Sequence, residues 1–190
     1  MRKPTFILLL FLSLSLGASA QSFTSIRVSL IGEQLSLPLS FSGPMAAGLE
    51  VSTDIRFREK EKSNRLINLS LTAFSREGVN NTFYLMGSYE HQAFLGESAA
   101  LSFEGGLGYA HTFFAGTAYK LENGSYEETR TASKPGVAAK ISTGIYLRRQ
   151  KRIQPYASYS LMADYTLPAL FPPVAPHSVL QAGVRFLINP

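Results

Sequence analysis

An alternation of apolar and polar residues recurs along most of this chain, and it limits the folds that the chain can adopt. Successive side chains of a β-strand point to opposite faces, so a period of two predicts strands with one apolar and one polar face. In residues 49–58, for example, Leu49 and Ile55 share one face while Glu50 and Asp54 share the other. Six further segments alternate in the same way: residues 67–73, 83–90, 101–109, 137–147, 156–162 and 179–188.

An eighth strand is expected near the start of the chain, where two segments compete. One is the stretch 25–30, and the other is the stretch 34–41. Pro38 lies inside the second stretch and cannot donate to a sheet ladder, which counts against it. One bent strand or a short hairpin would use both pieces, so the alternatives stay open. Prolines also interrupt the long uncharged stretches 34–49 and 165–175, so neither is predicted to form a membrane helix.

The N-terminus has the pattern of an export signal. A basic start is followed by an apolar run at 6–16 and by the small-residue sequence Ala-Ser-Ala at 18–20. This pattern predicts a cleaved signal peptide over residues 1–20 and one mature domain over 21–190. A signal anchor is the alternative, but the apolar run is shorter than the ~20 residues that a spanning helix needs. The chain has no cysteine, so neither disulfides nor a lipid on cysteine is expected.

Charge is scarce and concentrated at a few places. Charged residues make up 16% of the chain, against ~25% in ordinary soluble domains. Two clusters, within 56–65 and 148–152, lie at the ends of alternating segments, whereas the polar faces at mid-strand are mostly Ser, Thr, Gly, Asn and Tyr. Small polar side chains suit a narrow barrel interior, and the apolar faces would then contact lipid. A soluble lipocalin-like barrel is the alternative. The net charge is +5, or about +3 once the two basic residues of 1–20 are removed, which is too mild to favour nucleic acid.

The connections between the segments differ in length in a regular order. Short connections lie at 59–64, 95–99 and 148–152, and the others lie at 43–47, 76–81, 113–135 and 166–176. Transmembrane barrels have short periplasmic turns and longer external loops. With both termini in the periplasm, the sequence therefore predicts an all-β, eight-stranded, antiparallel, up-and-down transmembrane β-barrel.

The final segment carries a further pattern. Gln181, Gly183, Phe186 and Ile188 follow the order polar, glycine, hydrophobic, hydrophobic. This order resembles the insertion signal of outer-membrane β-barrels, although the chain continues past its aromatic residue. With the glycine-rich stretch 105–109, the chain resembles small barrels of the OmpA, OmpX and OmpW kind, and in style the outer-membrane barrels of Bacteroidetes. The resemblance implies the outer membrane of a Gram-negative bacterium, contact with its lipid, and insertion by the barrel assembly machinery.

Charged residues on the polar faces form the main candidate site. Charge in a narrow interior is costly unless it is paired, so Arg185 is expected to bond one or more of Glu50, Asp54 and Glu104. Such a network is either structural or a gate. Its predicted members are Glu50, Asp54, Arg56, Glu104, Lys140 and Arg185.

The expected role is that of a non-enzymatic barrel with a filled interior and a structural or surface-binding function. Residues 113–135 contain an Asn-Gly hairpin signal and would carry an extracellular ligand site. The alternatives are a small channel or transporter for a hydrophobic solute and, least favoured, a lipid-modifying enzyme that uses His177 and Ser178 with Glu127 or Glu128 at the rim. No cofactor and no metal site is predicted, because the three histidines show no ligand spacing.

Overall fold

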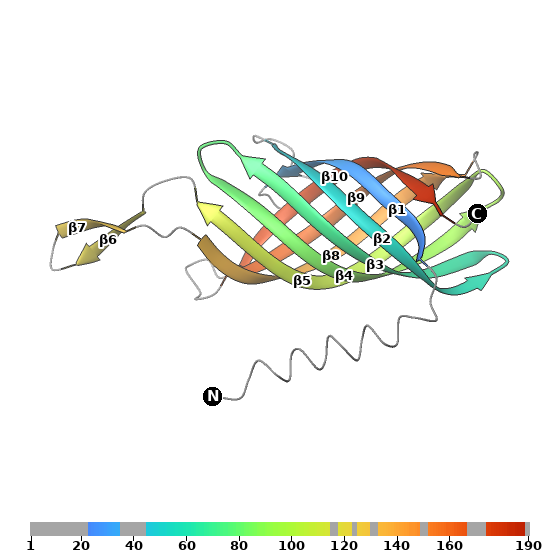
Figure 1. Ribbon diagram of the computed structural model, residues 1–190, viewed down its shortest axis with the longest axis horizontal. Coiled ribbons are helices and arrows are strands. Elements are labelled where there is room, and N and C mark those ends of the chain that lie inside the picture. Colours follow the sequence, from blue (N-terminus) through green and yellow to red (C-terminus); the bar gives the residue numbers. More distant parts are fainter. Residues whose placement is uncertain are drawn as a thin grey trace, which may run out of the picture.

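The computed structural model describes residues 23–34, 45–114, 118–122, 125–129, 133–148, 152–166 and 174–188. Eight long antiparallel strands form a closed barrel, in which β1 pairs with β10 (Figure 1). The barrel strands are β1 (Phe23–Gln34), β2 (Ala46–Lys60), β3 (Ser63–Arg76), β4 (Asn80–Leu95), β5 (Ala99–Phe114), β8 (Ser133–Leu147), β9 (Ile153–Thr166) and β10 (Val174–Leu187). The predicted fold class is confirmed.

The first strand is the earlier of the two candidates. β1 includes all of 25–30 and ends at Gln34, while residues 35–41 of the second candidate lie outside the described residues. The expected signal peptide, residues 1–20, also lies outside them. No helix in the described part of the chain is long and apolar enough to cross a membrane.

The strands are strongly staggered around the barrel. Following paired residues from Ile31 in one direction leads to Thr112 of β5, and following them in the other direction leads to Ser102 of the same strand. These positions differ by ten residues (112 against 102), so the strands tilt relative to the barrel axis. Because of this tilt, side chains far apart in sequence and register meet at the same depth inside the barrel.

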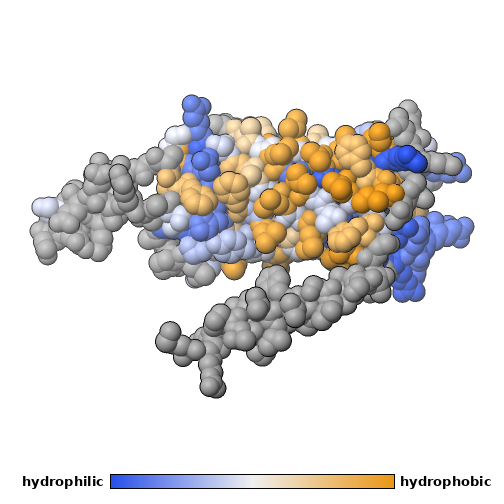
Figure 2. Space-filling model, viewed as in Figure 1, coloured by the Kyte–Doolittle hydropathy of each residue, from blue (hydrophilic) through white to orange (hydrophobic). Residues whose placement is uncertain are grey.

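The apolar faces of the strands form the outer surface. Leu107 is 72% exposed and Leu69 is 46% exposed. Ile55 is an exception at 9%, because it lies between Phe23 and Ile67 on the neighbouring strands. Figure 2 shows the resulting apolar band between two hydrophilic ends. A soluble barrel would bury these residues, so the band confirms the transmembrane interpretation.

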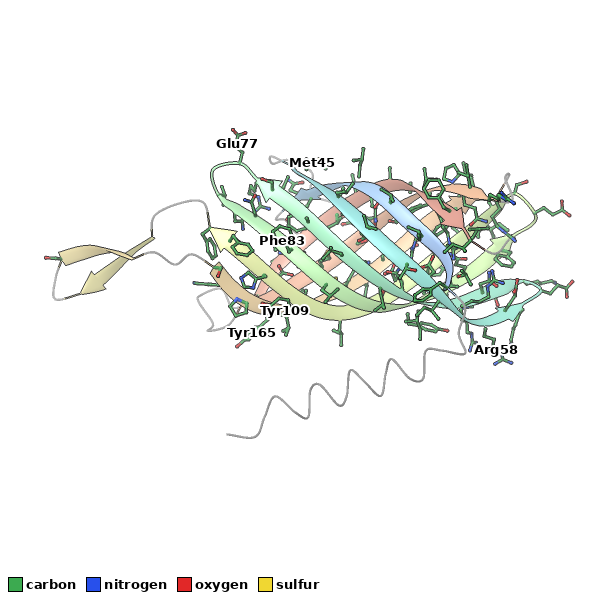
Figure 3. All side chains as sticks on the ribbon, in the orientation of Figure 1. Met45, Arg58, Glu77, Phe83, Tyr109 and Tyr165 are labelled. Atoms are coloured by element: carbon green, nitrogen blue, oxygen red, sulfur yellow. The ribbon has the colours of Figure 1, made fainter. Side chains whose placement is uncertain are left out.

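Aromatic residues mark the border of the apolar band. Phe83, Tyr109 and Tyr165 lie on the outer wall toward the end that carries the longer connections (Figure 3). Tyr89 is exposed toward the end with short turns, at a position two residues before His91. Such rings occupy the membrane–water interfaces of transmembrane barrels. Since transmembrane barrels have short periplasmic turns, we assign the end with short turns, where β1 begins and β10 ends, to the periplasm.

Candidate functional site

Most charged side chains inside the barrel lie together in two neighbouring hydrogen-bonded groups, one around Asp54 and one around Glu50, which we call the lower network. It lies in the periplasmic half of the barrel and draws on six strands. Its four carboxylates and three cations are all largely or fully buried. The charged members are Arg27, Glu50, Asp54, Glu90, Glu104, Lys140 and Arg185.

Asp54 is the centre of the lower network. Its Oδ1 accepts from Arg27 Nη2 at 2.6 Å and from Asn68 Nδ2 at 3.0 Å. Its Oδ2 accepts from Ser25 Oγ at 2.5 Å and lies 3.0 Å from Nε of Arg185. A buried carboxylate is stable only when its lone pairs are satisfied in this way. Asp54 therefore holds two arginines from the two strands that close the barrel, β1 and β10.

Both arginines make further bonds on the far side of the interior. Arg27 lies 3.0 Å from Oε2 of Glu90 and donates to the Tyr146 hydroxyl at 2.5 Å. Arg185 donates to Gln92 at 3.1 Å and lies over the Tyr146 ring at 5.5 Å. The network thus connects β1, β2 and β10 with β4 and β8 across the barrel axis.

Two smaller groups complete the network. Lys140 Nζ lies 2.7 Å from Glu104, which also accepts from Ser88. Glu50 accepts from Thr72 at 2.9 Å and from Gln181 at 2.7 Å. In each group, uncharged side chains donate hydrogen bonds to the carboxylate, which lowers the free-energy cost of burying its charge.

The structure brings together five of the six charges singled out in the sequence, with Arg185 on Asp54. Arg56 is separate: it donates to Glu59 at 2.5 Å at the periplasmic mouth. Sequence reasoning missed Arg27 and Glu90 as members, although both occupy polar positions of alternating segments. Their position on the polar face of an alternating segment is the sequence signal that indicates that their side chains face the barrel interior.

The residues of the terminal pattern divide between the two faces of β10. Gln181 is bonded inside the barrel, while Phe186 and Ile188 are exposed on the outer wall. Gly183 is close to the backbone of β1, where an added Cβ would lie 2.4 Å from the Val28 carbonyl oxygen. A side chain at this position would push the closing strands apart.

An apolar layer covers the external side of the lower network. On β1, the inward residue Ile31 separates Ser29 from Glu33, and on β10, Val179 separates Gln181 from His177. Every barrel strand except β2 contributes to this layer. Its members are Ile31, Phe74, Tyr84, Met86, Ala110, Ala138, Met162 and Val179.

A second, smaller apolar group covers the periplasmic side of the network. Tyr146 and Tyr156 stack with ring centroids 5.0 Å apart, beside Ala100 and the partly buried Phe94. The guanidinium of Arg148 lies 3.8 Å from the centroid of the Phe94 ring. The lower network is therefore enclosed by apolar side chains at both ends.

Polar residues form a second group above the apolar layer, which we call the rim cluster: Glu33, Arg76, Tyr84, Asp164 and His177. The Nδ1 atom of His177 lies 2.6 Å from Glu33, and its Nε2 atom lies 3.2 Å from Asp164. Arg76 donates to both oxygens of Glu33 at 2.9 and 2.7 Å, and Tyr84 donates to Asp164. Among the described residues, no hydrogen bond or ion pair joins the rim cluster to the lower network.

The arrangement imagined for a rim enzyme does not form around His177. His177 points into the barrel, whereas the next residue, Ser178, has the outward parity and contacts the Tyr159 hydroxyl at 3.2 Å. The side chains of Glu127 and Glu128 lie outside the described part of the chain. Within the described ranges, no three His, Asp or Glu side chains are arranged to hold a metal ion.

A separate hairpin extends from the external end of the barrel. Strands β6 (Ala118–Glu122) and β7 (Ser125–Thr129) pair with each other and lie beyond the barrel wall (Figure 1). The hairpin falls within the segment 113–135, between β5 and β8. The predicted hairpin is thereby confirmed for its two strands, while Asn123 and Gly124 lie outside the described residues.

Comparisons with known proteins show similarity of fold without similarity of sequence. No protein-family model matches the chain, and no curated protein matches it in sequence. Neisserial surface protein A is similar in structure, with a TM-score of 0.58 and 10% identity over 86% of this chain and 96% of that chain. The outer membrane enzyme PagL has a TM-score of 0.52 and 11% identity over 85% of this chain and 98% of that chain. The chain thus has the fold of small outer-membrane barrels, and the apolar band on its outer wall is the surface that such a barrel presents to lipid.

Proposed function

We propose that the protein is a non-conducting barrel of the outer membrane, with a structural role and an external hairpin that serves surface binding. The observation that carries this proposal is the filled interior. The apolar layer crosses the barrel between two polar groups whose hydrogen bonds and ion pairs lie within each group. An eight-stranded barrel has an interior narrow enough for side chains to fill, so neither water nor a solute has a continuous polar path.

Conductance in planar bilayers tests the closed interior. The purified protein is expected to give no steady conductance above that of the bare membrane. A double variant, Met86→Ser with Met162→Ser, replaces two members of the apolar layer and should admit water and small ions. Leu107→Ser changes an outward residue and is the matched control, expected to stay silent. Large, steady conductance by the unaltered protein would refute the closed barrel and favour the channel alternative.

Antibody labelling of intact cells tests the role of the hairpin. A short epitope inserted between Asn123 and Gly124 should be labelled on intact cells, because β6 and β7 lie beyond the external end. The same epitope inserted between Glu61 and Lys62, in the β2–β3 turn, should be labelled only after the outer membrane is opened. The reverse result would place the hairpin in the periplasm and end the proposed surface role.

The absence of enzymatic activity is part of the proposal. Both ring nitrogens of His177 contact a carboxylate, Nδ1 that of Glu33 and Nε2 that of Asp164. Ser178 lies on the opposite face of the same strand. This geometry disfavours the nucleophile–base pair that a lipid-modifying rim site would require. The acylation pattern of lipid A is therefore expected to be the same in cells with and without the protein. A difference that His177→Gln abolishes would support the enzyme instead.

The proposal includes the route to the membrane. A signal peptide at residues 1–20 would direct export, and the outward aromatic at Phe186 would be recognised by the barrel assembly machinery. Phe186→Ala should reduce the folded fraction in outer-membrane preparations, measured as the heat-modifiable band on gels. Phe103→Ala removes another exposed aromatic and is the control, expected to leave assembly unchanged.

A further inference from the structure

Three side chains that carry or can carry positive charge form a row on the outer wall at the periplasmic end. The register pairs Arg58 of β2 with Arg65 of β3, and Arg65 with His91 of β4. Arg65 and His91 have the same parity as Ile67 and Tyr89, which are 37% and 45% exposed on the lipid-facing surface. The row therefore lies just beyond the apolar band, at the level of the periplasmic headgroups.

A β-bulge places Arg58 in this row. The register of β2 with β3 shifts between Arg56 and Arg58, so one residue of β2 has no partner. Arg56 lies opposite the fully buried Leu66 and has the inward parity. Without the shift, Arg58 would share that parity. Figure 3 shows Arg58 directed away from the barrel, as expected when a bulge redirects a side chain at a barrel rim.

Among the described residues, no carboxylate forms an ion pair with Arg58, Arg65 or His91. Arg58 and Arg65 are directly opposite each other, and like charges in that position destabilise a strand pair. The two carboxylates at the turn end of this hairpin are placed elsewhere, since Glu59 bonds Arg56 and Glu61 lies in the turn. The Nε–H of Arg65 is covered and has no acceptor among the described residues. An anion between the two guanidinium groups would remove the repulsion and supply acceptors.

We propose that this row binds the phosphate of a phospholipid headgroup in the periplasmic leaflet. Arginine presents paired donors that match phosphate oxygens, and the imidazole of His91 adds another donor. Phe103, the next residue in the row on β5, is 55% exposed and would lie against the acyl chains of the same lipid. A phospholipid would supply phosphate oxygens to the charged row and acyl chains to the adjacent apolar wall. This inference rests on the proposed orientation of the barrel, with the short turns in the periplasm, and does not depend on what the external hairpin binds or on the closed interior.

Thermal unfolding in maltoside micelles, which contain no phosphate, tests the proposal. Phosphatidylglycerol at saturation should raise the unfolding temperature by about 5 °C. Diacylglycerol has the same acyl chains without phosphate, and sodium phosphate has the anion without chains; neither should reproduce the rise. Arg65→Gln should raise the unfolding temperature in lipid-free micelles, because the repulsion is gone, and should abolish the further rise with phosphatidylglycerol.

Arg152→Gln is the matched control. Arg152 is an exposed arginine at the same end of the barrel but precedes β9, on the wall opposite β3. Its variant should keep the full rise, and native mass spectrometry should show phosphatidylglycerol retained by it and lost by Arg58→Gln and Arg65→Gln. An equal rise with sodium phosphate would mean a free-anion site, and an equal rise with diacylglycerol would mean chain contacts alone. Loss of the rise in Arg152→Gln would mean general charge attraction. Each of these results overturns the proposal, and none bears on the conductance or labelling experiments.

Discussion

The lower network and the rim cluster are built from the same residue types but differ in enclosure. The carboxylates of Asp54 and Glu90 are fully buried beneath apolar side chains at both ends. In the rim cluster, Glu33 is also fully buried, but its partner Arg76 retains 20% exposure, and Asp164 retains 11%, close to the 10% of Glu104 in the lower network. Ion pairs that keep contact with water lose less when a partner is removed. Substitutions in the lower network are therefore expected to lower the free energy of unfolding more than substitutions in the rim cluster.

Asp54→Ala should have the largest effect, because it leaves Arg27 and Arg185 buried without their shared carboxylate. We expect a loss of about 3–5 kcal/mol in the free energy of unfolding. Urea titration in detergent micelles, followed by heat-modifiability on gels, measures it. Asp54→Asn keeps the shape of the side chain and should fall between Asp54→Ala and the unaltered protein. A loss below about 1 kcal/mol for Asp54→Ala would mean that the lower network contributes little to stability.

Met86→Ala should rank second, because it opens a cavity in the apolar layer that separates the two polar groups. A Met→Ala change in a packed interior costs about 2–5 kcal/mol. Leu107→Ala removes a larger exposed surface from the outer wall, where lipid replaces the lost contacts, and should cost much less. Equal losses for the two variants would show that the interior is not closely packed.

His177→Gln should rank third and tests the rim cluster directly. Glu33 keeps both bonds from Arg76, and Asp164 keeps its bond from Tyr84, so no carboxylate is left without a donor. Loss of hydrogen bonds to charged groups costs about 1.5–3 kcal/mol. The same urea titration applies. A loss as large as that of Asp54→Ala would erase the distinction between the rim cluster and the lower network.

Arg56→Gln should have the smallest effect. Its partner Glu59 is 57% exposed at the periplasmic mouth, and exposed pairs contribute about 0.2–1 kcal/mol. The unfolding midpoint should thus be nearly unchanged. A loss comparable with that of Asp54→Ala would return Arg56 to the lower network, where the sequence had placed it.

The sequence predicted the barrel because alternation is a local property that each strand displays by itself. Leu69, Leu107 and Asp54 lie on the faces that their parity required. Parity also separates His177 from Ser178, so the pairing of these two residues at a rim site could have been excluded from sequence alone. The face on which Arg58 lies could not be predicted in this way, because it depends on a β-bulge and the alternation does not indicate the extra residue.

The partners inside the barrel could not be predicted, because they depend on the stagger between strands. Glu33 and His177 are separated by 144 positions in the sequence, and Tyr84 and Asp164 by 80. Parity indicates that such residues face inward but not at which depth they meet. The stagger is set by the packing of the whole ring, so the rim cluster was missed, and its charged members Glu33, Arg76 and Asp164 were not among the predicted inward charges.

The apolar layer divides the cylinder into two compartments that have only the wall in common. Substitutions in the external compartment, and insertions in the loops above it, leave every bond of the periplasmic compartment in place. The protein can therefore diversify the half that meets its surroundings while the other half keeps the strands joined. Such a partition lets one scaffold carry many different outer surfaces.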